Sequence, residues 1–378
     1  MAFILHDVLQ IAPGSLAVSP TAYFLMTRLD GTHSIKDLQA AFQAETGVAD
    51  LPAEEIQRLV SALDQYGLLE TTRFHAALEA RQREYRAAPT QDVRPRWPAA
   101  ELLGPAISDL LAGATPQFTG EIRGLIAPHL DYQRGAPCYA AAYAVLAQAP
   151  PADRYIILGT NHFGRAKGPV ATAKDFETPF GTVTTDRAFI QQVAERLNTD
   201  LCQSDMDHTI EHSVELQVML LQHCRPASGF AIVPILCPDV CGLSPDDGAT
   251  ETAHEVARLA DVLKSLVADD ALRTIVIAGA DLSHVGLAFG DEAPATPESL
   301  ADVERTDRSL LDHLCRQDHA RFRDELRISA NPTRVCSTGC LYAISRTLSD
   351  CRCHLLGYHQ AVDARTDTNV TCAAAVFA

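Results

Sequence analysis

Three short segments place chemically capable side chains directly after apolar runs that are typical of buried strands. They are "GLIAPHLDY", "YIILGTNH" and "TIVIAGADLSH". Their polar residues are His129, Asp131 and Tyr132; Asn161 and His162; and Asp281, Ser283 and His284. Ligands of open α/β sheets bind beyond the carboxyl ends of the strands, so we expect one shared hollow there. Two or three imidazoles and a carboxylate would bind a transition metal and leave positions for substrate, oxygen or water.

A fourth segment, "DMDHTIEHSVELQ", adds His208, Glu211 and His212. If the segment is helical, the two histidines share one face, with Glu211 beside them. A histidine in this group is suited to acid–base chemistry near neutral pH. The HExxH motif of zinc peptidases is excluded, because Thr209 follows His208. One histidine at a strand end is usually a surface residue, but three such ends and this segment together favour a metal or catalytic cluster.

Strand-like and helix-like segments alternate from residue 119 onward, which predicts an α/β domain with a central parallel or mixed sheet between helices. The strand-like runs are "IRGLIAP", "RYIILGT", "GFAIVPILC", "RTIVIAG", "CHLLGYH" and "TCAAAVFA". The helix-like runs are "CYAAAYAVLAQ", "DRAFIQQVAERLN", "EHSVELQVMLLQH", "AHEVARLADVLKSLVA" and "GCLYAISRTLS".

Residues 1–73 predict a separate, mostly helical domain. Ser34 is placed to cap one helix, Pro52 to begin a second and Gly67 to end it. With "GLLET" as a short strand, the outline is a winged helix. "LDGTHSIKDL" and "ALDQYGLLE" resemble the PqqD-like modules of peptide maturation systems, and the resemblance implies binding of a peptide as an added strand. A helical appendage for packing or dimerisation is the alternative. Residues 74–118 predict a helix and a linker.

Composition limits the partners. The 378 residues carry a formal net charge of −17, which disfavours binding to nucleic acid. No apolar run reaches the roughly 18 to 20 residues of a membrane span. The N-terminus has no basic start and does not read as a signal peptide, so we expect a cytoplasmic protein. An oligomer is compatible with the sequence.

The 11 cysteines form no CxxC pair and have an odd count, which predicts reduced thiols instead of a disulfide framework. Cys336 stands out, because it precedes a predicted helix whose N-terminus would favour its thiolate. We assign it to the predicted substrate pocket, together with Asn161 and Ser283.

The domain 119–378 resembles the Memo family, whose prokaryotic members are called AmmeMemoRadiSam system protein B. The resemblance rests on "IAPHLDY", "ILGTNHFG", "TPFGTVTTD", "EHSVELQ", "IVPILC", "GADLSHVG" and "VCSTGCLYAI", which follow the family order. Memo proteins are similar in fold to the LigB-type class III extradiol dioxygenases, which use non-haem Fe(II). The resemblance therefore implies an iron-dependent oxygenase fold.

Carried over by position, the resemblance implies that His129 and His162 bind the metal and that His212 is the acid–base residue. The dioxygenases have a glutamate, and animal Memo proteins a cysteine, in the segment that we align with "DLSHVG". Ser283 occupies that position here, so Asp281, His284 or water is expected as the third ligand. Asp131 is expected either to orient His129 or to cap the following turn.

The sequence thus predicts a metal-dependent oxygenase for a small aromatic or a peptide- or amino-acid-derived substrate. Fe(II) is the favoured cofactor, with Cu or Zn as alternatives. Glu211 or His208 would assist His212, while Asp131, Tyr132 and Asn161 would orient ligands or substrate. Two alternatives stay open: a metal-binding scaffold on a relict enzyme fold, which the serine at position 283 favours, and a zinc-dependent hydrolase.

Overall fold

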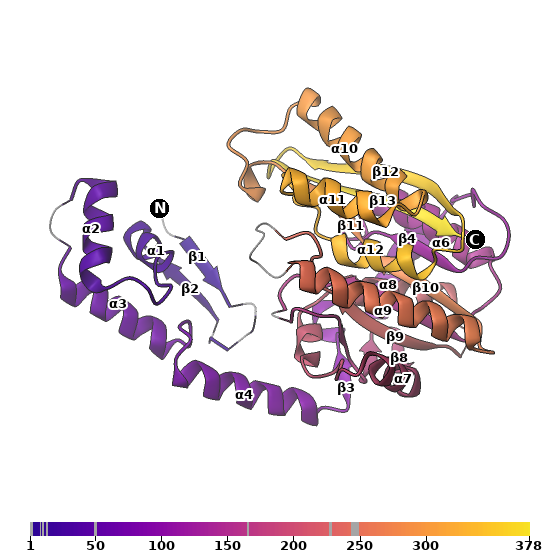
Figure 1. Cartoon of the computed structure of the whole chain (residues 1–378), viewed down its shortest axis with the longest axis horizontal. Coiled ribbons are helices and arrows are strands. Elements are labelled where there is room, and N and C mark those ends of the chain that lie inside the picture. Colours follow the sequence, from indigo (N-terminus) through magenta and orange to yellow (C-terminus); the bar gives the residue numbers. More distant parts are fainter. Residues whose placement is uncertain are drawn as a thin grey trace. The chain divides into compact units, whose positions relative to one another are not determined.

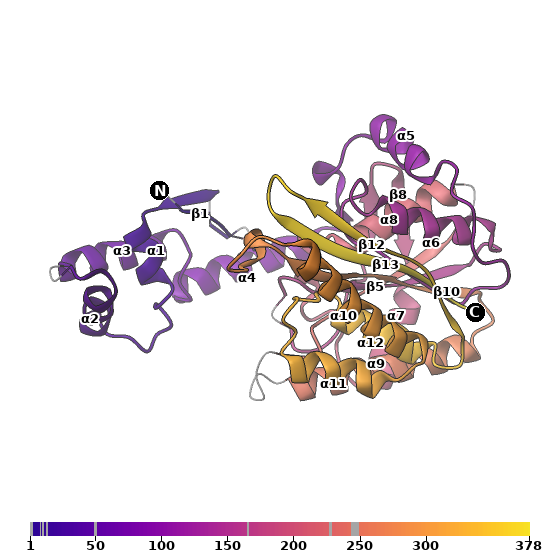
Figure 2. The same cartoon turned by 90° about the horizontal axis from the view of Figure 1, so that it is seen from above.

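The computed structural model describes residues 3–7, 9, 11–12, 14–48, 51–164, 166–226, 229–242 and 249–378. Internal contacts divide the chain into two compact units, Met1–Ala88 and Pro89–Ala378. Figures 1 and 2 show both units from two directions.

In its described residues, the N-terminal unit combines a two-stranded antiparallel sheet with four helices. Its elements are β1 (Phe3–His6), β2 (Ser15–Val18), α1 (Pro20–Met26), α2 (Ile35–Thr46), α3 (Ala53–Gln65) and α4 (Thr72–Ala87). Ser34 caps α2 through a capping box, as predicted, and Pro52 is the N-cap of α3. Gly67 follows α3 with a φ of +74°, which suits glycine at a helix end. A small core of Leu25, Leu38, Phe42, Leu51 and Ile56 holds the helices together.

The prediction of a strand over 67–71 was wrong. Leu68 donates its backbone N–H to Leu63, and the Thr71 hydroxyl donates to Asp64 at 2.5 Å, so the segment folds back onto the end of α3. Thr71 is then the N-cap of α4. The sheet of this unit comes instead from β1 and β2, whose short alternating pattern we did not recognise as strands.

The second unit begins with a segment that we predicted as linker. It contributes a strand, a short 3₁₀ helix and an α-helix, namely β3 (Thr90–Asp92), η1 (Arg94–Arg96) and α5 (Ala100–Leu111). β3 pairs in parallel with β7 (Asp175–Thr178) at the edge of the large sheet. Leu103 and Ile107 of α5 are buried in the core beside Val93.

The large sheet has the order β11-β13-β4-β10-β5-β9-β8-β7-β3, with β12 beside β13 and β6 beside β9. Its strands are β4 (Gly124–Ala127), β5 (Arg154–Thr160), β6 (Val170–Ala171), β8 (Gly181–Thr185), β9 (Ala231–Cys237), β10 (Thr274–Gly279), β11 (Asp281–Val285), β12 (Cys353–Asp363) and β13 (Thr368–Phe377). The central strands β4, β10, β5 and β9 are parallel, and β13 runs antiparallel to β4, β11 and β12. The predicted mixed α/β sheet is confirmed.

Helices cover both faces of this sheet (Figure 2). They are α6 (Ala136–Gln148), α7 (Arg187–Leu197), α8 (Ser213–Cys224), α9 (Ala249–Asp269), α10 (Pro297–Cys315), α11 (His319–Ser329) and α12 (Thr338–Thr347), with the short η2 (Asp205–Thr209) and η3 (Leu287–Phe289). One large apolar cluster lies under α7, α9, α10, α11 and α12, and another under α5, α6 and α8.

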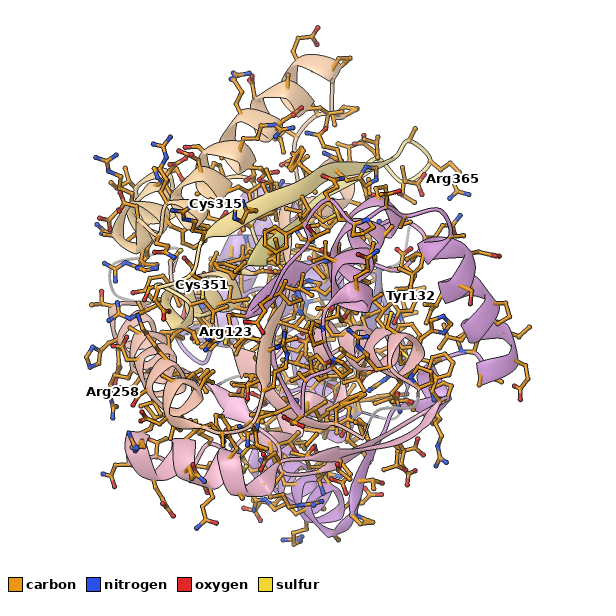
Figure 3. All side chains as sticks on the ribbon, turned by 90° about the vertical axis from the view of Figure 1, so that its right-hand side faces the viewer. Arg123, Tyr132, Arg258, Cys315, Cys351 and Arg365 are labelled. Atoms are coloured by element: carbon orange, nitrogen blue, oxygen red, sulfur yellow. The ribbon has the colours of Figure 1, made fainter. Side chains whose placement is uncertain are left out.

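The central parallel strands are buried along their whole length, which explains their continuous apolar sequences. Side chains fill the space between the layers, whereas Arg365 points out from the surface (Figure 3). None of the helices in the described part of the chain combines the length and apolar character that a membrane crossing requires.

Candidate metal centre

The carboxyl ends of the central strands meet beside the N-terminus of α8. β4 leads to His129, β5 leads to His162, and His212 is the N-cap of α8. Two glycines permit this approach: a Cβ on Gly159 would lie 2.5 Å from Ser213 Oγ, and one on Gly279 would lie 2.5 Å from the Ser213 carbonyl oxygen. The helix end therefore reaches the strand ends directly.

The three imidazoles form one cluster. The ring centroid of His129 lies 4.8 Å from that of His162 and 5.4 Å from that of His212. The rings of His162 and His212 are stacked, with centroids 5.3 Å apart and an interplanar angle of 13°. The prediction that distant strand ends bring these histidines together is confirmed by this geometry.

A thiol completes the set of possible ligands. Donor atoms of His129, His162 and Cys336 all lie within 4.8 Å of one another, and the Cys336 Sγ is 3.5 Å from His129 Nε2. Donor atoms of His162, Glu211 and His212 form a second group of the same size. Either group has the residue types that bind a transition metal ion.

Hydrogen bonding fixes the tautomer of His129. Its Nδ1 lies 2.9 Å from the Gly279 carbonyl oxygen, which only accepts, so Nδ1 carries the proton. Nε2 is then left as a lone-pair donor facing Cys336. Burial lowers the pKa of His129 well below its ordinary value and keeps the ring neutral. A neutral imidazole with a bonded far nitrogen is the usual form of a metal ligand.

Glu211 fixes the orientation of the His162 ring in the same way. Its carboxylate accepts the His162 backbone N–H at 3.0 Å and the ring Nδ1–H at 2.9 Å, and it also accepts the Ser213 backbone N–H at 3.0 Å. Burial alone would raise the pKa of Glu211, but these bonds and the nearby histidines hold it at about 2. The carboxylate is therefore ionised and directs His162 Nε2 away from itself.

The chemistry of Cys336 differs from our prediction. It lies before the N-cap Ser337 of α12, yet burial raises the pKa of its thiol well above the ordinary value. The helix N-terminus does not make it a free thiolate. A half-buried thiol with a raised pKa ionises when a metal cation replaces its proton, which fits a ligand role better than a nucleophile role.

Ser283, which we placed in the substrate pocket at the position aligned with the family's third ligand, does not line the cavity over the histidine cluster. Its side chain is fully buried, and its hydroxyl bonds to Asp307 and Thr333, each at 2.7 Å. "DLSHV" is itself a strand, β11, whose register against β13 shifts between Asp281 and His284. This irregularity breaks the simple alternation of side chains, so Ser283 points away from the cluster while its neighbours at 281 and 284 line the cavity.

The cavity over the cluster has a volume of 380 Å³. It is lined by Trp97, His129, Leu130, Asp131, Arg134, His162, His212, Leu216, Asp281, His284, Phe289 and Val370. Burial raises the pKa of Asp281 to about 7 and lowers that of His284 to about 4. Asp281 also accepts the backbone N–H of His129 at 3.0 Å, and its other oxygen lies 3.6 Å from His129 Nε2.

The prediction that His208 and His212 share a helical face was also wrong. The 3₁₀ helix η2 ends at Thr209, and α8 begins at Ser213, so the two histidines belong to different elements. His208 is buried and donates from Nε2 to the Val170 carbonyl oxygen at 3.1 Å. Burial lowers its pKa to about 4. It does not line the cavity, and its contacts are those of a structural residue.

The remaining predicted site residues hold the loops around the cavity. Asp131 accepts the Arg134 backbone N–H at 3.0 Å, so it caps the turn, and it is Asp281 that contacts His129. Tyr132 donates its hydroxyl to the Leu216 carbonyl oxygen at 2.8 Å. Asn161 donates to Asp207 at 3.0 Å and accepts the Gly164 N–H at 2.9 Å. Tyr132 and Asn161 are not among the side chains that line the cavity.

Sequence reasoning missed the wall formed by the segment "RPRW". Trp97 donates from Nε1 to Glu215 Oε2 at 2.9 Å, and Arg96 donates to the other oxygen of this buried carboxylate. The indole thus lies against the cavity while α8 holds its polar edge. Trp97 is the only tryptophan in the sequence, but nothing in its polar, proline-rich surroundings connects it to histidines far along the chain.

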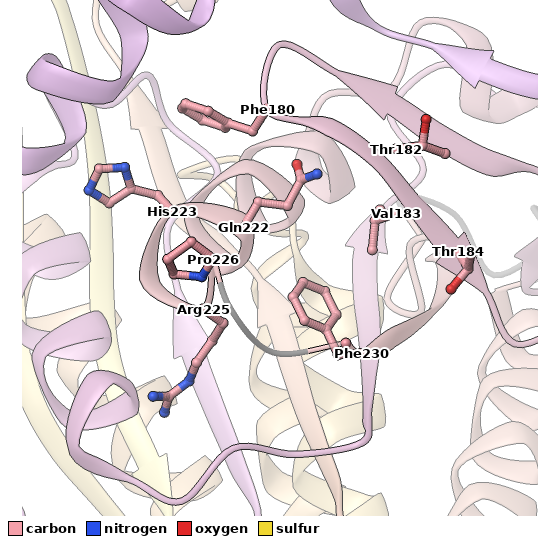
Figure 4. A pocket seen from close by; sticks show the side chains of 10 residues that line it. Phe180, Thr182, Val183, Thr184, Gln222, His223, Arg225, Pro226 and Phe230 are labelled. Carbon is pink, nitrogen blue, oxygen red and sulfur yellow. The ribbon is translucent and has the colours of Figure 1, made fainter.

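A larger cavity of 660 Å³ lies elsewhere (Figure 4). Phe180, Gln222, His223 and Phe230 are among the residues that line it, and it shares no lining residue with the histidine cavity. Within the described residues, neither candidate group of metal ligands includes a residue of this cavity. Size alone therefore does not identify the site.

Comparisons with known proteins match the sequence to a family. The family model described as "Memo-like protein" matches residues 99–376. A "MEMO1 family protein" of Aquifex aeolicus is 26% identical over 383 residues, which cover 99% of this chain and 96% of that protein. One of Thermus thermophilus is 29% identical over 286 residues (75% and 81%), and one of Methanococcoides burtonii is 34% identical over 199 residues (52% and 64%).

Proposed function

The chain belongs to the Memo family, and from this premise we propose that it is a metal-dependent enzyme. The metal ligands are His129, His162 and Cys336, and the reaction is oxygenation of a small aromatic or a peptide- or amino-acid-derived substrate. One observation carries the proposal: the imidazoles of His129 and His162 line a cavity, and their donor atoms and the Cys336 thiol all lie within 4.8 Å of one another. Three protein ligands leave positions for substrate and oxygen.

The donor set suits Fe(II), Cu or Zn. Imidazole binds all three, while a thiolate favours the softer ions. We propose Fe(II) as the working cofactor, because an iron ion with open positions supplies the chemistry for adding both atoms of O₂ to a substrate without a separate reductant. The substitution at position 283 no longer weighs against redox chemistry, because Cys336 supplies the third donor.

The protein's own residues have distinct tasks in this proposal. Glu211 orients His162 through its Nδ1–H, and the Gly279 carbonyl orients His129. His212 accepts or returns a substrate proton, since burial lowers its pKa and its ring is neutral beside the other two imidazoles. Asp281 with a pKa of about 7 is a second group that holds or releases a proton near neutrality.

The test begins with anaerobic purification, followed by metal analysis of the wild-type chain and of His129→Ala, His162→Ala and Cys336→Ser. We expect one bound iron per wild-type chain and loss of the metal in each variant. Ser283→Ala is the matched control, because it alters a buried hydroxyl outside the cluster. Oxygen uptake with catechols and aromatic amino acids then tests turnover. Full metal content in Cys336→Ser contradicts the ligand assignment.

The thiol at position 336 supports a second candidate, a metal-binding scaffold without turnover. A His₂Cys set is well suited to holding copper or zinc, because the thiolate is a soft ligand. Tightly bound copper without oxygen uptake supports this alternative. Zinc with hydrolysis of an ester or amide substrate supports the zinc-dependent hydrolase.

The N-terminal unit contributes to the proposal independently. Apolar side chains of Leu29, Ile35, Leu38, Ile56, Val60, Leu68 and Leu69 line a cavity of 690 Å³ within it. We propose that this unit binds a peptide, which would present a peptide-derived substrate. Titration of the full-length protein with a fluorescent peptide, with Val60→Asp as the disruptive variant, tests this part.

A further inference from the structure

Arg134 is the cation that faces the cavity mouth. It lines the histidine cavity and also an adjoining cavity of 820 Å³, so it lies where the two meet. Its charge acts on buried Asp281, whose pKa it lowers against the larger effect of burial. Its side chain is 39% exposed, which leaves it accessible to a ligand entering from outside.

The hydrogen bonds of Arg134 leave its terminal N–H donors open. Its Nε donates to Asp131 Oδ2 at 2.5 Å, and its backbone N–H donates to Asp131 Oδ1. Neither terminal nitrogen, Nη1 or Nη2, has a partner among the described residues. The planar guanidinium is the side chain best matched to a carboxylate, because two parallel N–H groups bind both oxygens.

Aromatic and aliphatic side chains form part of the cavity wall beside this cation. Trp97 lines one part of the cavity and is held by its bond to Glu215. Phe289, Leu130 and Val370 line another part and pack together as a small cluster. The volume of 380 Å³ lies at the small end for ligand sites, which suits one ring and not a long chain. Trp97 precedes residues 99–376, which match the family model, so the part of the wall formed by the indole lies outside the matched segment.

We propose that the cavity binds a small aromatic carboxylate, with the ring against Trp97 and Phe289 and the carboxylate on the terminal nitrogens of Arg134. This inference rests on the proposed function, because it names the substrate class of the same cavity. Arg134 is a specificity residue in this arrangement. Asp131 opposes the ligand, since its carboxylate competes for the same guanidinium.

The experiment uses the metal-free full-length protein and the fluorescence of Trp97, the only tryptophan in the sequence. Benzoate and its neutral isostere benzamide are titrated in parallel. We expect benzoate to bind roughly tenfold more tightly than benzamide, as hydrogen bonds to a charged group imply. Arg134→Gln should abolish this preference and leave benzamide binding unchanged.

Asp131→Asn provides a matched control with the opposite sign. Asparagine still accepts the backbone N–H that closes the turn, but it frees the guanidinium, so benzoate binding should strengthen. Arg134→Lys keeps the positive charge but lacks the two parallel N–H groups of the guanidinium. It replaces Arg134→Gln if that variant does not fold. Equal affinities for benzoate and benzamide, or an unchanged preference in Arg134→Gln, overturn the inference. Metal binding is measured separately, on samples of the same variants to which Fe(II) has been added, so a failure to bind metal refutes the proposed function alone.

Discussion

Replacing Glu211 by glutamine tests whether one buried carboxylate organises the metal centre. The carboxylate accepts three N–H groups, from the His162 backbone, the His162 ring and the Ser213 backbone. A glutamine oxygen cannot accept all three, and the amide nitrogen would turn a donor toward a donor. At least one buried N–H group therefore loses its partner, and the His162 ring loses its orientation.

The magnitude follows from the pKa. Glu211 is held at about 2 against an ordinary value of 4.5, and each pKa unit corresponds to about 1.4 kcal/mol. The ionised carboxylate therefore contributes about 3 kcal/mol to stability at neutral pH. Because the folded-state pKa is lowered, this contribution is present above pH 4.5 and is lost as the pH falls toward 2. Glu211→Gln should also weaken metal binding roughly 10- to 100-fold, as expected when a partner of a metal-bound histidine is removed.

Metal affinity is measured by competition with a chromophoric chelator, and stability by urea unfolding of the metal-free protein at pH 7. Glu215→Gln is the matched control, because Glu215 is a second buried carboxylate, in the first turn of α8, that contacts Arg96 and Trp97 instead of a histidine. It should leave metal affinity unchanged. Wild-type metal affinity in Glu211→Gln would refute the reasoning, since the orientation of His162 would then not depend on this carboxylate.

Three further predictions concern other buried groups. Burial raises the pKa of Glu215 from 4.5 to about 7. The free energy of unfolding of the wild-type protein should therefore fall by about 3 kcal/mol as the pH rises between these values. Urea unfolding of Glu215→Gln at pH 5 and pH 8 should lack this part of the decline in stability. Cys336→Ser should lose metal while Ser283→Ala keeps it, and Ser283→Ala should unfold about 1 to 3 kcal/mol more easily because it breaks a buried hydrogen bond to a carboxylate. Hydrogen peroxide should form a disulfide between Cys315 and Cys353, whose Sγ atoms lie 3.0 Å apart. Peroxide oxidises one thiol to a sulfenic acid, and the second thiol attacks the sulfenic sulfur and releases water. Non-reduced peptide mass spectrometry that finds only free thiols contradicts this prediction.

The α/β fold was predictable because its central strands are buried on both faces. "RYIILGT" and "RTIVIAG" have continuous apolar interiors and match β5 and β10 residue for residue or within one position. The strands β8, β7 and β3, which lie toward one edge of the sheet, are short and half polar, and pairing with distant neighbours decides their conformation. Local sequence contains little information on such pairing, and β1 and β2 escaped recognition for the same reason.

The meeting of His129 and His162, the two proposed histidine ligands, was predictable because parallel strands deliver their carboxyl ends to one edge of the sheet. The approach of Cys336, the third proposed ligand, was not, because Cys336 comes from the start of a helix and not from a strand end. Strand periodicity alone would give Asp281 and Ser283 the same face, but the register shift in β11 separates them. A bulge of one residue is invisible to periodicity and reverses which side chain reaches the cavity.

The segment "EHSVELQ" explains why spacing alone could not assign roles here. Glu211 bonds His162, His212 joins the imidazole cluster, and Ser213 donates to the Thr160 carbonyl at the end of β5. Glu215 holds Trp97, and Gln217 donates to the Pro128 carbonyl just before His129 at 2.6 Å. One helix start thus fixes both histidine-bearing strand ends and the aromatic wall. The motif is dense in polar residues because each of them holds a different part of the site, so substitutions along it should separate metal affinity, ligand preference and stability from one another.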